Sequence, residues 1–143
     1  MKKNTPISSI ESEKIKMIKE YLMKDQNVLF AVLFGSVASA LYVRIVSHLP
    51  SILKASDIDI GIYFKNPPEG LELLEYITAI SELVNEDLDI VVLNKASPFL
   101  KHQIMKNRVI LVMNDRLAYR QFREQTISDY QEYRYISGMD KYA

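Results

Sequence analysis

Two aspartates, Asp57 and Asp59, stand two residues apart in a segment whose sequence is typical of a β-strand. In residues 56–64, apolar and polar side chains alternate with a period of two. Both aspartates therefore lie on one face of the expected strand, and the other face carries Ile58, Ile60, Ile62 and Phe64. Side chains two residues apart are roughly 6.5 Å apart at the backbone, so their carboxyl groups can share a divalent cation. The spacing predicts a metal site.

Asp89 supplies a third acid from another alternating segment, residues 86–93. If its strand pairs with the first, Asp89 joins Asp57 and Asp59. Three carboxylates about 5 Å apart would repel by about 3 kcal/mol per pair at an effective dielectric near 20, so protons or cations must compensate them. Mg²⁺ suits an all-oxygen site and is commonly held by one or two carboxylates together with substrate phosphates. Exposed paired carboxylates also occur without any chemistry, but aspartate is depleted in strands, which favours the metal site.

Gly35 and Ser36 follow the apolar run of residues 28–34. A strand that ends in Gly-Ser and turns into a helix offers unpaired backbone N–H groups and the positive end of a helix dipole, which together bind anions. Phosphate is the expected ligand. A Gly-Ser pair alone is uninformative, but its combination with the three aspartates, in this order, indicates an enzyme.

Residues 33–36, 56–60 and 88–93 together resemble the motifs of the polymerase-beta-type nucleotidyltransferase superfamily. Within it they are most similar to the minimal (MNT) members, the MntA-like antitoxins of HEPN/MNT toxin–antitoxin systems. The resemblance spans residues 28–136 and includes the tail pattern of residues 100–114, followed by a helix rich in tyrosine and arginine. It implies an α/β (α+β) nucleotidyltransferase fold, a small mixed sheet of four strands flanked by helices.

The same resemblance implies an activity. An MNT antitoxin of this kind transfers AMP from ATP to a tyrosine hydroxyl of its cognate HEPN ribonuclease toxin and thereby silences it. Asp57 and Asp59 would then hold Mg²⁺, and Asp89 would hold a second ion or accept the proton of the attacking hydroxyl. Gly35 and Ser36 would bind the terminal phosphates. The expected cofactors are Mg²⁺ and ATP as donor, and the expected partner is the toxin, in a hetero-oligomer.

Two departures from the family pattern concern the segment after Ser36. Residues 37–56 make it longer than the family usually has, and Ser39 and Ala40 stand where the family motif Gly-Ser-x-Ala-Arg-Gly has arginine and glycine. Arg44 is the expected replacement for that arginine at the nucleotide, and Lys54 is a second candidate. The departures also leave open a non-catalytic antitoxin that acts by binding alone. A nucleotidyltransferase for a small molecule, such as an aminoglycoside, is the other alternative.

The composition limits the class of protein. A chain of 143 residues suits one domain, residues 1–143. Its 18 basic and 18 acidic side chains balance, so no nucleic-acid template is expected. Cysteine is absent, in agreement with a reducing compartment. Neither a signal peptide nor a membrane-spanning run is evident, and we expect a soluble, cytoplasmic protein.

Periodicity and breaker residues predict the remaining elements. The apolar run of residues 28–34 is expected to be the central strand, buried on both faces, and residues 108–113 an edge strand. A short helix after Ser97-Pro98 should turn Phe99, Leu100 and Ile104 inward. The last helix is a candidate interface because it is rich in tyrosine and arginine. Residues 1–9 are expected to form a flexible tail, and the expected helices cover residues 10–23, 37–48, 71–84 and 116–136.

Overall fold

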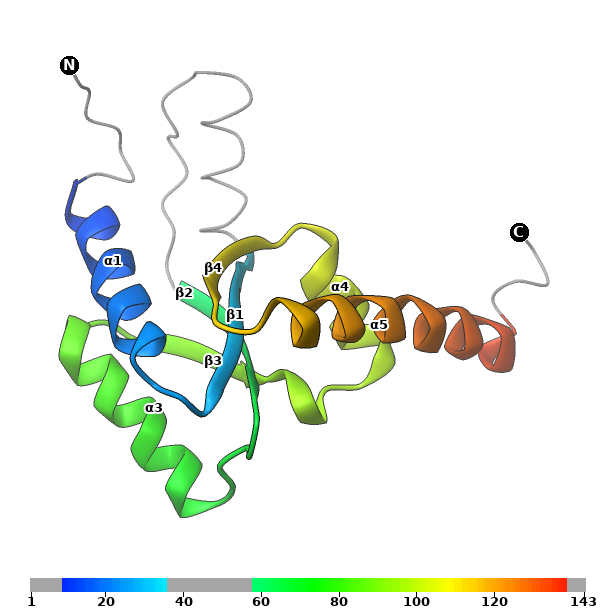
Figure 1. Ribbon diagram of the computed structural model, residues 1–143, viewed down its shortest axis with the longest axis horizontal. Helices are drawn as coiled ribbons and strands as arrows, with labels where there is room; N and C mark the ends of the chain where they lie inside the picture. The colour runs from blue at the N-terminus through cyan, green and yellow to red at the C-terminus, as the bar shows by residue number, and fades with distance from the viewer. Residues whose placement is uncertain (1–8, 36–57, 139–143) are drawn as a thin grey trace.

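A four-stranded sheet in the order β3-β2-β1-β4 forms the centre of the computed structural model, which describes residues 9–35 and 58–138 (Figure 1). The strands are β1 (Val28–Phe34), β2 (Ile58–Phe64), β3 (Leu88–Val92) and β4 (Val109–Met113). β1 pairs antiparallel with both β2 and β4, and β2 pairs parallel with β3. The expected small mixed sheet is confirmed, with β4 at an edge.

The parallel pairing of β2 and β3 requires a crossover connection. The helix α3 (Leu71–Val84) provides it, beginning after the Pro67-Pro68 turn and ending at Asn85, which adopts the left-handed conformation. The crossover returns the chain to β3 so that Ile58 pairs with Leu88 and Asp59 with Asp89.

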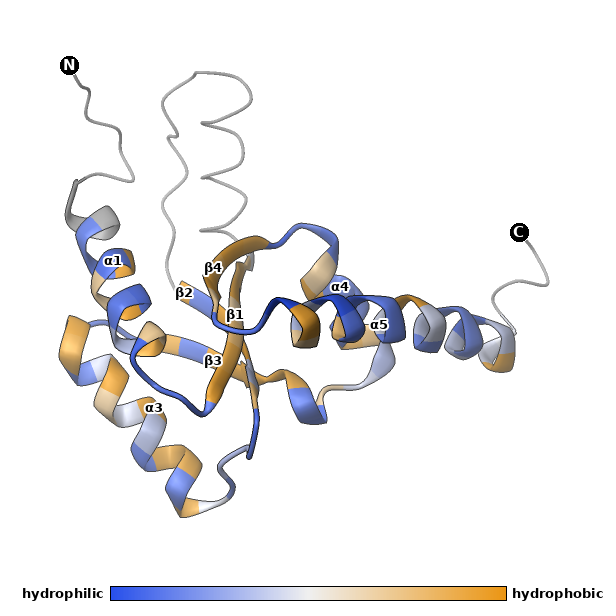
Figure 2. Ribbon diagram, viewed as in Figure 1, coloured by the Kyte–Doolittle hydropathy of each residue, from blue (hydrophilic) through white to orange (hydrophobic). Residues whose placement is uncertain are grey.

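Helices cover both faces of the sheet (Figure 1). On one face α1 (Ser9–Met23) and α3 pack over Ile58, Ile60, Ile62 and Phe64 of β2. On the other face α4 (Pro98–Lys106) and α5 (Arg116–Ser137) cover Phe30 and Val32 of β1. Because β1 is apolar on both sides, it contributes to both clusters, and Figure 2 shows its hydrophobic ribbon at the centre of the molecule.

The first turn of α4 differs from the sequence-based expectation. Ser97 caps this helix by accepting a hydrogen bond from the Leu100 N–H at 3.2 Å. Phe99 and Leu100 were expected to face inward, but they are 42% and 38% exposed. Only the last turn of α4 reaches the sheet, where Ile104 and Met105 are buried.

The last helix was expected over residues 116–136 and spans Arg116–Ser137, with Asp115 as its N-cap. The expected tail at residues 1–9, apart from Ser9, and the expected helix at 37–48 lie outside the described residues. No helix in the described ranges is long and apolar enough to cross a membrane.

Candidate active site

Asp59 and Asp89 are direct partners in the β2–β3 ladder. Asp59 shares its strand face with Tyr63, and Asp89 shares its face with Val91, since alternate residues of a strand point the same way. Tyr63 and Val91 both pack under α4 and α5, so the two carboxylates lie on that same face. Neighbouring strands are about 4.8 Å apart. The predicted pairing of the Asp89 strand with the Asp59 strand is therefore confirmed.

Gly35 brings the end of β1 against Asp59. Phe34 pairs with Asp59 across the β1–β2 ladder, and Gly35 follows with a φ of 75°, a conformation that favours glycine. A Cβ added to Gly35 would overlap Asp59 Oδ2 and lie 3.0 Å from Asp59 Cγ. Glycine is thus required here for two reasons, its backbone conformation and the space that the carboxylate occupies.

These residues share one edge of the sheet, which we call the Asp59 edge and define by Gly35, Asp59 and Asp89. Because β1 runs antiparallel to β2 and β3, its C-terminal end meets their N-terminal ends. Asp59 is half-buried and Asp89 is exposed. Asp89 therefore offers its carboxylate oxygens to solvent at an edge that it shares with Asp59 and Gly35.

The other predicted site residues, Asp57, Ser36 and Arg44, lie outside the described residues, as does Lys54. Within residues 9–35 and 58–138, no three histidine or acidic side chains gather into a potential metal site. The two described carboxylates nevertheless match Mg²⁺ in type, since this ion is commonly bound through one or two of them.

A layer of aromatic rings supports the sheet below the Asp59 edge. The Phe30 ring contacts those of Tyr63, Tyr119 and Phe122 at centroid distances of 5.2, 5.1 and 5.3 Å. These rings bind α5 to the centre of β1 and β2, and aromatic pairs of this kind add about 0.5–1.5 kcal/mol each beyond the area that they bury. Phe30 and Tyr63 are each four residues from the paired positions Phe34 and Asp59, so these rings fix α5 to the sheet at a distance from the Asp59 edge.

Arg108 is a residue near this edge that sequence analysis did not single out. It directly precedes Val109, which pairs with Leu33, so it lies beside Phe34 at the end of β1. Its Nε donates a hydrogen bond to the Tyr119 hydroxyl at 2.6 Å and its Nη1 donates one to the Met105 carbonyl at 3.0 Å. Only the pairing of β4 with β1 reveals this position.

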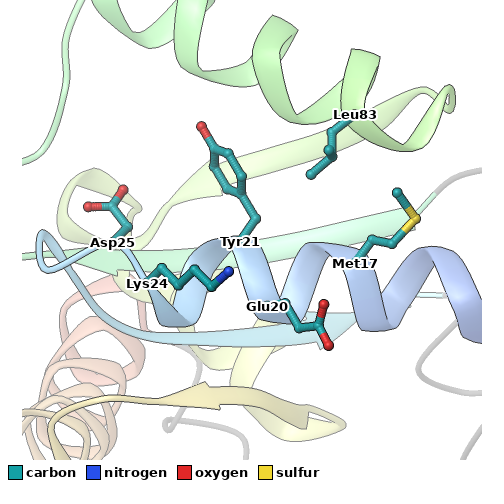
Figure 3. Close-up of a pocket in the computed structure, with 6 residues that line it drawn as sticks. All are labelled: Met17, Glu20, Tyr21, Lys24, Asp25 and Leu83. Carbon is teal, nitrogen blue, oxygen red and sulfur yellow. The ribbon is translucent and has the colours of Figure 1, made fainter.

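A separate pocket of about 500 Å³ lies between α1 and α3 (Figure 3). The residues that line it are Met17, Glu20, Tyr21, Lys24, Asp25 and Leu83. Beside it the Tyr76 hydroxyl donates a hydrogen bond to Asp25 Oδ2 at 3.1 Å. Burial, and then the negative charge of Asp25, raise the pKa of Tyr76. Because α1 and α3 cover the opposite face of the sheet, this pocket is distinct from the Asp59 edge.

Comparison with solved structures places the fold among toxin–antitoxin proteins. One structure, a tri-AMPylated Shewanella oneidensis HEPN toxin in complex with an MNT antitoxin, matches with 23% identity over 94% of this chain and 99% of that chain, with a TM-score of 0.63. A toxin–antitoxin structure with AMP-PNP matches with 22% identity over 92% and 98%, and a TM-score of 0.65. An MntA–HepT toxin–antitoxin structure matches with 22% identity over 94% and 97%, and a TM-score of 0.60. At these identities the likeness establishes the fold.

A comparison with curated proteins finds no match. Residues 16–117 match the family model described as "Polymerase beta, Nucleotidyltransferase". The matched segment covers most of the chain and contains Gly35, Asp59 and Asp89, the three residues that meet at the Asp59 edge. On this evidence the chain belongs to the polymerase beta nucleotidyltransferase family.

Proposed function

We propose that this protein is an antitoxin that transfers AMP from ATP to a tyrosine hydroxyl of a cognate HEPN ribonuclease toxin. The pairing of Asp59 with Asp89 beside the Gly35 turn carries the proposal, because two carboxylates and a tight glycine turn suit a metal-bound triphosphate. The family match supports nucleotidyl transfer. The similar structure in which an MNT antitoxin accompanies a tri-AMPylated HEPN toxin supports the acceptor.

In this proposal Asp57, Asp59 and Asp89 are the metal ligands, for two Mg²⁺ ions, and Gly35, Ser36 and Arg44 bind the nucleotide. The side chains of Asp59 and Asp89 fit Mg²⁺, because both offer oxygen ligands and the two residues are paired across neighbouring strands. Bound Mg²⁺ would supply charge neutralisation for the triphosphate and stabilise the entering and leaving oxygens. Because Gly35 has no Cβ, the Asp59 carboxylate can lie directly against the end of β1.

The reaction is a substitution at the α-phosphorus of ATP. The tyrosine oxygen of the toxin forms the new P–O bond, the bond to the β-phosphate bridging oxygen breaks, and pyrophosphate leaves. Asp89 either holds the second ion or accepts the tyrosine proton, and its exposure at the Asp59 edge allows both roles. Holding the hydroxyl in line with the phosphate can by itself supply several kcal/mol, within the roughly 7–11 kcal/mol available from positioning.

The toxin is proposed to dock on α5, although not through the tyrosines that face inward. Tyr119 packs against Phe30, and Tyr130 stacks on His102 with 3.6 Å between ring centroids. These rings hold α4, α5 and the sheet together and are not available to a partner. The interface role of the inward tyrosines is therefore excluded from the proposal.

Three exposed arginines, Arg116, Arg120 and Arg123, lie on one side of α5 because they are spaced by four and three residues. None of them makes a hydrogen bond or an ion pair within the described ranges. Together with Ile127, which is 52% exposed, they form the α5 arginine surface. Arginine is enriched in interfaces, so this surface is the proposed contact with the toxin.

The test is coexpression with the proposed HEPN partner, followed by intact mass spectrometry of that partner. We expect a mass gain in units of AMP that disappears in Asp59→Asn. The double variant Arg120→Glu/Arg123→Glu should weaken the complex by at least tenfold and lower the modified fraction. Lys16→Glu/Lys19→Glu, an equal reversal at two exposed positions of α1, is the matched control and should leave the complex and the modified fraction unchanged.

A second candidate is an antitoxin that neutralises by binding alone. The replacement of the family arginine and glycine by Ser39 and Ala40 favours it. A toxin that is neutralised without any mass gain would select this candidate and contradict AMP transfer. Transfer to an aminoglycoside but not to the toxin would select the small-molecule alternative.

A further inference from the structure

Arg108 lies on the same face and at the same end of the sheet as the two aspartates. Val109 pairs with Leu33, and both pack toward α1 and α3. Phe34 follows Leu33, and Arg108 precedes Val109. Because adjacent residues of an extended segment point to opposite faces, Phe34 and Arg108 point toward α4 and α5. The contact of Arg108 with Tyr119 of α5 agrees with this orientation.

The strand order therefore places four residues in a row across one end of the sheet. It runs from Asp89 on β3 through Asp59 on β2 and Gly35, directly after β1, to Arg108, directly before β4. Two strand spacings, roughly 10 Å, separate the backbones of Asp59 and Arg108. The two aspartates and Arg108 are thus on opposite sides of the end of β1.

The Arg108 guanidinium is held in place but still has donors to offer. Nε and Nη1 are occupied by the Tyr119 hydroxyl and the Met105 carbonyl, and the Tyr119 ring lies 5.7 Å from the guanidinium carbon. Nη2 has no hydrogen-bond partner among the residues of the described ranges. Arginine stays charged at any relevant pH, and a fixed guanidinium loses little further freedom when it binds an anion.

We propose that Arg108 is a substrate-binding residue that contacts the nucleotide phosphates on the side of the Gly35 turn away from Asp59. The inference rests on the proposed function, since it takes the bound nucleotide to lie at the Asp59 edge. A triphosphate whose metal-bound part lies at the carboxylates and which extends past Gly35 across the end of β1 meets Arg108 next. Bonds between a guanidinium and a phosphate are charge-assisted and can be bidentate.

The experiment measures equilibrium binding of ATP and of adenosine to the full chain in the presence of Mg²⁺. It compares the wild type with Arg108→Gln, which removes the charge, and with Arg108→Lys, which keeps it. Lys65→Gln is the matched control, because Lys65 is an exposed cation directly after the opposite end of β2. Thermal unfolding of each variant reports whether the packing around Tyr119 survives.

We expect Arg108→Gln to weaken ATP at least tenfold, as loss of one charge-assisted contact would do, while adenosine affinity stays within twofold. Arg108→Lys should retain part of the ATP affinity and Lys65→Gln all of it. In AMP transfer to the toxin, Arg108→Gln should raise the KM for ATP by a similar factor.

Three outcomes would overturn the inference: unchanged ATP affinity in Arg108→Gln, equal losses for ATP and adenosine, or a wild type that binds both ligands alike. Equal losses would show that Arg108 only supports the packing. Failure of the proposed function looks different. If only the proposed function fails, Arg108→Gln would still lose affinity for ATP and not for adenosine, but the toxin would gain no AMP with the wild-type protein.

Discussion

Gly35 and Asp59 occupy adjoining space at the end of β1, so closely that a Cβ on Gly35 would overlap the Asp59 carboxylate. Residue 35 and the half-buried Asp59 are therefore structurally coupled. A change at the glycine acts on the carboxylate, and through it on any metal that the carboxylate holds.

Gly35→Ala is expected to damage the site as well as the fold. Gly70→Ala is the matched control, since Gly70 also has a positive φ, of 58°, but has no atom within 4 Å of an added Cβ. Gly70→Ala should lower the free energy of unfolding by about 1–3 kcal/mol, because a φ of 58° with a ψ of −128° is disfavoured for residues that have a Cβ. Gly35→Ala should cost more and should also reduce AMP transfer, whereas Gly70→Ala should leave transfer intact. Denaturant unfolding and the mass-spectrometric assay measure the two effects, and equal stability losses in the two variants would contradict the steric coupling.

Asp59→Asn and Asp89→Asn are each expected to reduce AMP transfer by about a hundredfold or more, a loss of roughly 2.7 kcal/mol of transition-state stabilisation. Each change preserves the side-chain shape but removes one negative charge from the proposed metal site. The free energy of unfolding should stay the same or rise, because charge clusters kept for function often reduce stability. Glu82→Gln, on the exposed side of α3, is the control and should retain full activity. Wild-type transfer in Asp89→Asn would exclude Asp89 from the reaction.

The pairing of Asp59 with Asp89 could be predicted because both segments alternate strictly and lie one helical segment apart. Period two fixes which side chains share a face, and a helix between two strands favours parallel pairing. The bounds of α5 could likewise be predicted from a long polar segment that follows an acidic cap.

Other features depend on contacts between distant residues. The place of Arg108 follows from the pairing of β4 with β1, which no local pattern encodes. The inward position of Tyr119 and Tyr130 depends on their partners Phe30 and His102. Phe99 and Leu100 match an apolar stripe, but the turn of α4 that carries them stays exposed. Predictions for Asp57, Ser36 and Arg44 concern residues outside the described ranges and stay predictions.

Thr126→Val is expected to stabilise the protein by about 1 kcal/mol. Thr126 is 3% exposed, and its Oγ1 has no hydrogen-bond partner among the described residues. Burial of an unpaired hydroxyl has a cost that valine, which has nearly the same shape, avoids. Thr78→Val, at an exposed position of α3, should change the free energy of unfolding by less than about 0.5 kcal/mol. Thr126 also lines a cavity together with Leu29 and Tyr63. Loss of stability in Thr126→Val would mean that water in this cavity satisfies the hydroxyl.

Tyr76→Phe is expected to make the protein less sensitive to alkaline unfolding. Burial, and then the charge of Asp25, raise the pKa of Tyr76 in the folded state. The folded state therefore keeps this proton at pH values where the unfolded chain, with a tyrosine pKa near 10, has lost it. Below about pH 10 the stabilising contribution of Tyr76 is fully present, and above it the contribution declines as pH rises.

The measurement is the free energy of unfolding in denaturant from about pH 8 to about pH 11, across the tyrosine pKa. At the lower pH, Tyr76→Phe should be less stable than the wild type by about 1 kcal/mol, because the hydrogen bond to Asp25 Oδ2 is lost. As pH rises, the wild type should lose stability faster, and the two curves should approach each other. Tyr135→Phe is the control, since Tyr135 is 78% exposed, and its curve should run parallel to that of the wild type. Parallel curves for Tyr76→Phe as well would show that the Tyr76 hydroxyl titrates alike in the folded and unfolded chain.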